Sequence, residues 1–216
     1  MLERMGEFFD ARLEGYEEHQ LTSIAHAREF YPFTAGCLPQ TGEPEVLDLG
    51  CGTGLELGYY YRKVPAARVT GVDLARGMLA ALRKRFPDKP LTLIEGSYFD
   101  VPLGERAFDA AVSVESLHHF TKEEKIPLYE RVLTALRPGG YFILTDYFAA
   151  SEEEEISRRA ELIRLKREQG VPEGWFCHFD TPLTVEHERE ALLAAGFASA
   201  EILKSWGATH TLKALK

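Results

Sequence analysis

The sequence predicts a doubly wound α/β fold built on a mostly parallel sheet. Short apolar runs alternate with longer helical patterns, and most of these runs are nearly continuous rather than alternating between apolar and polar residues. Continuous apolar strands are typical of parallel sheets whose two faces are both covered by helices. The chain has 216 residues, a length that favours one sizeable domain with its own core.

The middle of the chain holds five predicted strands joined by helices. The strands are expected at residues 45–49, 68–73, 91–95, 108–114 and 140–146. Helical patterns cover residues 55–63, 75–86 and 122–136. The order is therefore β-α-β-α-β followed by β-α-β, and right-handed crossovers limit how the strands can be arranged.

The tail of the chain predicts a helix and an antiparallel hairpin that complete a seven-stranded sheet. The helix spans residues 186–195 and stops at Gly196, a residue type common just after a helix. Two strands, at 200–204 and 209–215, flank the turn at Trp206 and Gly207. The last strand is expected to run antiparallel to the rest.

Four segments make up the expected organisation within a single domain. They are a helical N-terminal cap at 1–37, a sheet core at 38–147, a lid insertion at 148–182 and a terminal helix with its hairpin at 183–216. The insertion contains a predicted helix at 152–169 and an aromatic loop. Since neither the cap nor the insertion contributes strands, both are candidate lids.

Composition excludes several classes of partner. The 25 Lys and Arg residues against 34 Asp and Glu residues give a net charge of −9, which argues against nucleic acid because phosphate binding needs clustered cations. Three cysteines without a Cys-x-x-Cys spacing favour a reducing, cytoplasmic setting. No run approaches the roughly 18 apolar residues of a membrane span. Since the composition disfavours both nucleic acid and a membrane, the expected partner is a small molecule.

A glycine-rich turn follows the first predicted strand and predicts a ligand site. Gly50, Gly52 and Gly54 remove the side chains that would hold a ligand away from the backbone, and a helix N-terminus with free N–H groups comes next. The second strand ends at Asp73, where an acidic residue in a doubly wound sheet usually holds a ribose diol.

The glycine positions distinguish between two kinds of nucleotide ligand. A dinucleotide site needs glycines at positions one, three and six, but the sixth residue from Gly50 is Leu55. Asp48 also places a carboxylate where a pyrophosphate would lie, and it suits a cationic ligand instead. These two features oppose an NAD-dependent oxidoreductase and favour a nucleoside that carries an ammonium or sulfonium group.

The chain resembles a class I S-adenosylmethionine-dependent methyltransferase over most of residues 42–215. The blocks that carry the resemblance are residues 48–54, residues 71–75 with Met78, and residues 95–102, 108–120, 136–140 and 194–197. The resemblance implies a Rossmann-like fold with S-adenosylmethionine as cofactor and S-adenosylhomocysteine as product. The implied reaction is an in-line displacement that moves a methyl group to an O, N or C atom of a small molecule.

The resemblance also implies a set of cofactor contacts. Asp48, Gly50 and Gly52 are expected along the methionine part, Asp73 at the ribose, and Leu74 with Met78 against adenine. The third block departs from the family, because Ser97 follows Gly96 where many members have an acidic residue for the adenine amino group. The Ser97 hydroxyl, the backbone near Tyr98, or a stacked ring of Tyr98 or Phe99 is expected to contact adenine instead. The remaining expected cofactor contacts are Tyr16, Cys51, Thr53, Gly54, Val114 and Glu115.

Candidates for the acceptor side follow the fourth strand. His118 and Glu115 are expected to contact the acceptor or remove its proton, because imidazole titrates near neutrality, whereas His119 is expected to pack at the strand end. Tyr147, after the fifth strand, is a further catalytic candidate. The lids add four aromatic or imidazole residues that are expected to contact the substrate: Tyr16, His19, Trp175 and His178.

Two alternatives concern metal and activity. Residues 115–119 resemble the Glu-x-x-Glu-His metal ligands of some oxygen methyltransferases, with His118 in place of the second carboxylate. A metal would also need His178 or Asp180, so catalysis without metal is expected. The alternative function is a sensor or inactive subunit that binds S-adenosylmethionine without methyl transfer, and the chain is expected to be a monomer or homodimer.

Overall fold

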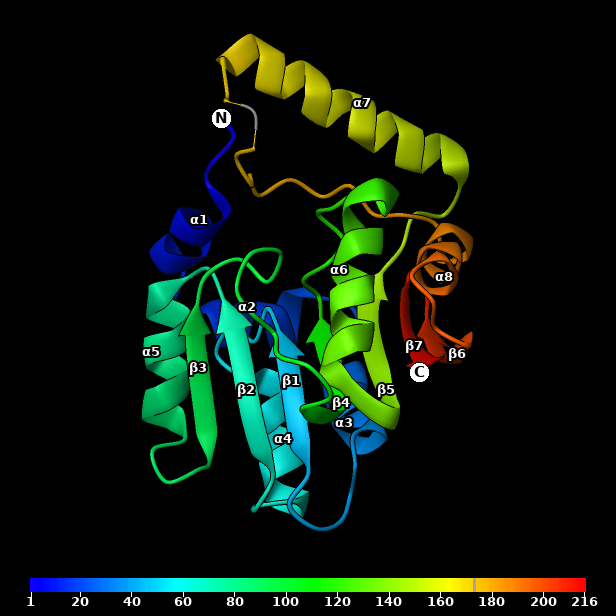
Figure 1. The fold of residues 1–216 in the computed structure, drawn as a ribbon. Helices are drawn as coiled ribbons and strands as arrows, with labels where there is room; N and C mark the ends of the chain where they lie inside the picture. The colour runs from blue at the N-terminus through cyan, green and yellow to red at the C-terminus, as the bar shows by residue number, and fades with distance from the viewer. Residues whose placement is uncertain (173) are drawn as a thin grey trace.

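The computed structural model describes residues 1–172 and 174–216, and its centre is a seven-stranded sheet in the order β3-β2-β1-β4-β5-β7-β6 (Figure 1). The strands are β1 Glu45–Leu49, β2 Arg68–Asp73, β3 Leu91–Glu95, β4 Phe108–Val114, β5 Leu136–Tyr147, β6 Ser199–Trp206 and β7 Thr209–Leu215. Strands β1 to β5 pair in parallel, and β7 runs antiparallel to both of its neighbours. The predicted doubly wound sheet with an antiparallel last strand is confirmed.

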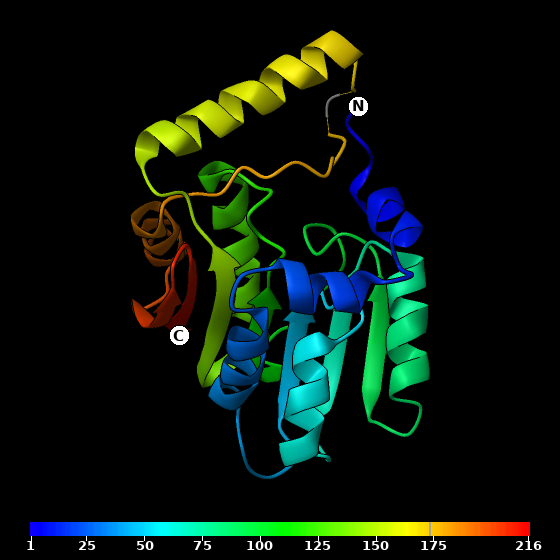
Figure 2. The ribbon, with the colours of Figure 1, turned by 180° about the vertical axis from the view of Figure 1, so that it is seen from behind.

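Helices cover both faces of the sheet (Figures 1 and 2). One face carries α3 Ala27–Cys37, α4 Leu55–Lys63 and α5 Arg76–Arg85, and the other carries α6 Lys122–Ala135 and α8 Val185–Ala194. Successive strand residues serve opposite faces: Leu47 packs in the cluster under α6 and α8, whereas Val46 packs in the cluster under α3 and α4. This alternation explains the nearly continuous apolar strands.

Strand β5 differs from the prediction at its start. It begins at Leu136 rather than at Gly140, because Leu136 pairs with Phe108 before the register shifts and Tyr141 pairs with Ala110. Gly139, with φ +80°, lies within the irregular stretch that absorbs the shift. The sequence Pro138-Gly139-Gly140 therefore interrupts the ladder without ending the strand.

Two segments outside the sheet meet beyond the carboxyl ends of the strands. The N-terminal segment forms α1 Met5–Ala11 and α2 Tyr16–Ser23, and α7 Glu152–Gln169 lies across the same end of the molecule (Figures 1 and 2). The Met5 N–H donates to the Phe176 carbonyl at 2.9 Å, and the His178 N–H donates to the Glu3 carbonyl at 3.0 Å. None of the described helices combines the length and the apolar character needed to cross a membrane.

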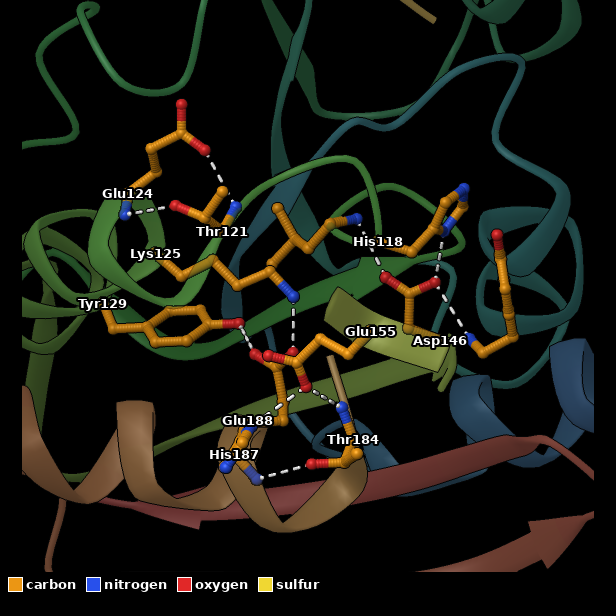
Figure 3. Close-up of polar contacts among 12 residues, drawn as sticks. His118, Thr121, Glu124, Lys125, Tyr129, Asp146, Glu155, Thr184, His187 and Glu188 are labelled. Carbon is orange, nitrogen blue, oxygen red and sulfur yellow. Dashed lines mark hydrogen bonds and ion pairs between the residues drawn. The ribbon is translucent and has the colours of Figure 1, made fainter. Parts of the chain in front are cut away.

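A buried polar network fixes α6 against α8 (Figure 3). The Lys125 ammonium pairs with the Glu188 carboxylate, which also accepts a hydrogen bond from the Tyr129 hydroxyl. All three side chains are buried. Since removing Lys125 or Glu188 would leave a buried charge unpaired, this network fixes how the two helices pack against each other.

Candidate active site

The turn after β1 forms the wall of a pocket at the carboxyl end of the sheet. Gly50, Gly52 and Gly54 have φ of +73°, +48° and +71°, values in the left-handed region that favours glycine. A Cβ added at Gly52 would meet only the Tyr16 hydroxyl, at 3.9 Å, and would therefore occupy the pocket. The backbone at this position is thus open to a bound molecule, as the sequence predicts.

Asp73 is held rigidly beside the glycine turn. Its Oδ2 accepts a hydrogen bond from the Gly52 N–H at 2.8 Å, and its Oδ1 accepts one from the Ala75 N–H at 2.8 Å. Burial raises the pKa of Asp73, while these two N–H groups oppose that shift. Each carboxylate oxygen retains a lone pair, so the group can accept further hydrogen bonds from a diol.

The pocket is lined by 13 residues. Nine of the residues expected to bind cofactor line it: Tyr16, Gly50, Gly52, Asp73, Leu74, Met78, Tyr98, Val114 and Glu115. Four further lining residues were not expected there: Met5, Phe9, Ser116 and His119. The glycine backbone, the fixed carboxylate and the apolar side chains of Leu74 and Met78 match the chemistry of an adenosyl group with a methionine tail.

Six of the expected cofactor residues do not line this pocket: Asp48, Cys51, Thr53, Gly54, Ser97 and Phe99. Asp48 is buried behind the glycine turn, where burial and then the neighbouring Glu56 carboxyl raise its pKa well above the ordinary value. Its Oδ2 has no hydrogen-bond partner among the described residues. The Ser97 side chain makes a local hydrogen bond instead, because its Oγ accepts from the Phe99 N–H at 3.2 Å.

A larger cavity opens beside the first pocket. Its walls include six residues expected on the acceptor side: Tyr16, Glu115, His19, His118, Tyr147 and His178. Trp175 was expected there too, but it lies outside this cavity, where the Arg4 guanidinium stacks on its ring at 4.0 Å. The aromatic and imidazole residues of the N-terminal segment and the 148–182 insertion are therefore divided between the cavity and the outer surface.

His118 is anchored by a carboxylate from the end of β5 (Figure 3). Its Nδ1 lies 2.6 Å from Oδ1 of Asp146. Asp146 also accepts from the Leu117 N–H at 2.9 Å and from the Tyr147 N–H at 3.0 Å. Burial disfavours the imidazolium, but the carboxylates of Asp146 and Glu115 raise the pKa of His118 above its ordinary value.

His119 lies in a different environment from His118. Its Nδ1 lies 3.2 Å from the Phe179 carbonyl and 3.3 Å from Oδ1 of Asp180. Burial, and then the nearby charge of His118, lower the pKa of His119 to about 4. The pKa values of the two adjacent imidazoles are therefore shifted in opposite directions, a difference that depends on residues of the insertion and of the strand ends that are far apart in the sequence.

Glu115 stands where the two cavities join. Its backbone has φ +50°, an unusual value for a residue with a side chain, and its Oε1 is buried without a hydrogen-bond partner among the described residues. Burial, and then the Asp146 carboxylate, raise the pKa of Glu115 to about 8. A strained backbone and an unpaired buried carboxyl are common at functional sites.

Four residues line both cavities: Phe9, Tyr16, Glu115 and His119. A molecule in the glycine-turn pocket and a second molecule in the larger cavity would thus meet at these side chains. Asp146 and Asp180 anchor the two histidines; Asp146 was not among the predicted site residues, and Asp180 was expected only as a possible metal ligand. Asp146 had one available signal, because it is an acidic residue near the carboxyl end of a predicted strand.

Comparisons with known proteins agree with this geometry. Residues 46–140 match the family described as a methyltransferase domain. A fatty-acid O-methyltransferase from Mycolicibacterium smegmatis is 34% identical over 141 residues, which cover 61% of this chain and 50% of that protein. The chain thus spans only half the length of this curated relative.

Solved structures share the fold. An S-adenosylmethionine-dependent methyltransferase from Mesorhizobium loti matches with a TM-score of 0.64 and 23% identity, covering 86% of this chain and 96% of that chain. Human N-acetylserotonin methyltransferase, solved in complex with S-adenosylmethionine, matches with a TM-score of 0.60 and 20% identity, covering 97% of this chain and 55% of that chain. The sheet order and the glycine-turn pocket agree with these similarities. Residues 46–140 are thus similar to a methyltransferase domain, and the chain shares the fold of the solved methyltransferases.

Proposed function

We propose that this chain binds S-adenosylmethionine in the glycine-turn pocket and transfers its methyl group to an oxygen atom of a small, partly apolar molecule in the larger cavity. The observation that carries this proposal is the junction at Phe9, Tyr16, Glu115 and His119, which line both cavities. The name of the fatty-acid O-methyltransferase relative supports an oxygen acceptor. Phe8, Phe9 and Tyr147 offer the cavity wall an apolar surface.

Five residues of the glycine-turn pocket would hold S-adenosylmethionine through close backbone approach, hydrogen bonds and apolar packing. Gly50 and Gly52 would face the methionine part, Asp73 would accept hydrogen bonds from the ribose hydroxyls, and Leu74 with Met78 would pack on adenine. The absence of a side chain at Gly52 supports close backbone approach. When bound, S-adenosylmethionine supplies a methyl group on a positively charged sulfur, and the buried carboxyl groups at this end of the sheet suit that charge.

On the acceptor side, the chain would mainly align the nucleophile and remove water. His118, fixed by Asp146, would contact the acceptor or take its proton, with Glu115 and Tyr147 beside it. The N-terminal cap at residues 1–37 and the insertion at 148–182 would act as lids. The stacking of Phe8 on His178, with ring centroids 3.5 Å apart, supports a joint closure of the two segments.

Product analysis tests this proposal directly. The full chain would be incubated with S-adenosylmethionine and a panel of fatty acids, phenols, alcohols and amines, and release of S-adenosylhomocysteine would be measured. We expect release with at least one acceptor that carries a hydroxyl or carboxyl group. Release with amines alone would contradict the oxygen acceptor. Cofactor binding without release from any acceptor would favour a sensor or inactive subunit.

A further inference from the structure

Two adjacent histidines and an aspartate bring three potential metal ligands together at the edge of the larger cavity. His118 and His119 follow β4, and Asp180 comes from the loop between α7 and α8. Oδ1 of Asp180 lies 3.6 Å from Nε2 of His118 and 3.3 Å from Nδ1 of His119. Tetrahedral ligands with metal bonds of 2.0 to 2.1 Å lie about 3.3 Å apart, so a small displacement would admit an ion.

The orientation of His118 suits metal binding. Its Nδ1 lies against Oδ1 of Asp146 at 2.6 Å, which leaves Nε2 to face Asp180. Asp146 is itself fixed by the backbone N–H groups of Leu117 and Tyr147. A carboxylate behind the non-ligating nitrogen is the usual arrangement for a metal-bound histidine, because it sets the tautomer and the direction of the ring.

The charges around these histidines also favour a cation. Oδ1 of Asp180 is buried and makes no hydrogen bond within the described part of the chain. Glu115 and Asp146 add two more carboxyl groups beside His118. Among the described residues, only the two imidazoles pair with Asp180, and no Lys or Arg does so. The carboxylates of Asp146 and Asp180 thus lie on either side of His118, an arrangement that would attract a bound cation.

We propose that His118, His119 and Asp180 form a binding site for a divalent transition-metal ion of the zinc or cobalt type. Two nitrogens and one carboxylate oxygen suit such an ion, and three protein ligands leave a fourth position for a molecule in the cavity. This set differs from the ligands that the sequence resemblance suggested, because Glu115 is not part of it, while His118, His119 and Asp180 are. Metal binding would replace the long contact between His119 Nδ1 and the Phe179 carbonyl.

Direct metal binding tests the site without any methyl acceptor. The full chain, freed of metal with a chelator, would be titrated with Co²⁺ and followed by visible absorption, and with Zn²⁺ by calorimetry. We expect one equivalent to bind with the strong absorption bands of four-coordinate Co²⁺. Asp180→Asn and His119→Ala should each weaken binding by more than the roughly 10- to 100-fold that loss of an outer-shell partner costs.

The matched control is His19→Ala, which removes another cavity imidazole and should leave metal affinity unchanged. Thermal unfolding checks the result in the same variants: Zn²⁺ should raise the midpoint for wild type and His19→Ala but not for Asp180→Asn. If His119→Ala does not fold, the metal affinity of Asp180→Asn alone tests the site, since Asp180 lies on a loop. Failure of the wild type to bind an ion, or equal affinity in wild type and Asp180→Asn, would overturn the proposal but leave the proposed methyl transfer untouched.

Discussion

The Nδ1 atom of His118 lies 2.6 Å from Oδ1 of Asp146, although 28 positions separate the two residues in the sequence. The contact joins the loop after β4 to the carboxyl end of β5, two neighbouring parallel strands. It fixes an imidazole at the wall of the larger cavity rather than in the glycine-turn pocket. The geometry therefore places His118 among the residues that would face the acceptor and not among those that line the glycine-turn pocket.

Replacing His118 should affect turnover and not cofactor binding. In His118→Ala the affinity for S-adenosylmethionine should stay within about 0.5 kcal/mol of wild type, because the ring faces the acceptor cavity. Loss of a general base typically lowers the rate by about 100- to 10,000-fold, whereas loss of simple alignment should cost less than about tenfold. Steady-state kinetics on the identified acceptor, with calorimetry of the cofactor, would distinguish the two roles.

Chelation supplies the control for His118. If a chelator abolishes turnover and Zn²⁺ restores it, His118 acts as a metal ligand rather than as a base. If turnover is insensitive to chelation but falls in His118→Ala, the imidazole acts on the acceptor itself. A fully active His118→Ala would remove both roles.

Glu115→Gln should stabilise the fold at mildly alkaline pH. The folded chain raises the pKa of Glu115 from 4.5 to about 8, so the folded state keeps a proton that the unfolded state has already released. Between these two values the folded state binds more protons, and stability falls as pH rises. Glutamine cannot ionise and avoids this loss.

Thermal unfolding at several pH values tests this expectation. The midpoint of Glu115→Gln should exceed that of wild type more at about pH 8 than at about pH 5. An equal difference at both values, or a larger one at the lower pH, would show that Glu115 does not retain its proton in the folded chain.

Deleting residues 1–20 should lower turnover more than thermal stability. The deletion removes α1 and most of α2, including Tyr16 and His19 at the cavity, while the two core clusters are built mainly from the sheet and its helices. Circular dichroism and the rate of S-adenosylhomocysteine release would measure the two effects. Full activity of the truncated chain, or failure to fold, would contradict the role of this segment as a lid.

Gly52→Ala should weaken S-adenosylmethionine binding by at least about tenfold, or 1.4 kcal/mol, because the added methyl group would project into the pocket. Gly42→Ala is the matched control: its φ is +78° and its added Cβ would meet nothing within 4 Å. Both changes should cost about 1 to 2 kcal/mol of folding stability through backbone strain. Calorimetry should find weaker binding only in Gly52→Ala, and equal affinities would remove Gly52 from the site.

The sheet was largely predictable because its signals are local. Strands such as Glu45–Leu49 and Arg68–Asp73 are apolar runs bounded by turns, so their limits agree with the structure. The start of β5 was not predictable in the same way, since Leu136 pairs with Phe108 only through a shift of register. A turn sequence and an irregular strand look alike when the partner strand is not known.

The site was only partly predictable for a related reason. Gly52 and Asp73 occupy consecutive strand ends, where the topology alone predicts a shared pocket. The environment of His119 depends instead on Phe179 and Asp180, which the lid brings close from 60 positions away. Asp48 illustrates the converse case, because its expected contact with the cofactor depends on a side-chain direction that spacing does not define, and the carboxyl lies behind the turn beside Glu56.

Calorimetric binding of S-adenosylmethionine to wild type and Asp73→Ala tests the central claim most directly. Asp73 lines the glycine-turn pocket with both carboxylate oxygens fixed by backbone N–H groups. We predict one bound equivalent for wild type, and a loss of about 1.5 to 3 kcal/mol in the folded variant, the range for hydrogen bonds to a charged group. No binding by wild type, or an unchanged dissociation constant in Asp73→Ala, would contradict the assignment of this pocket to S-adenosylmethionine.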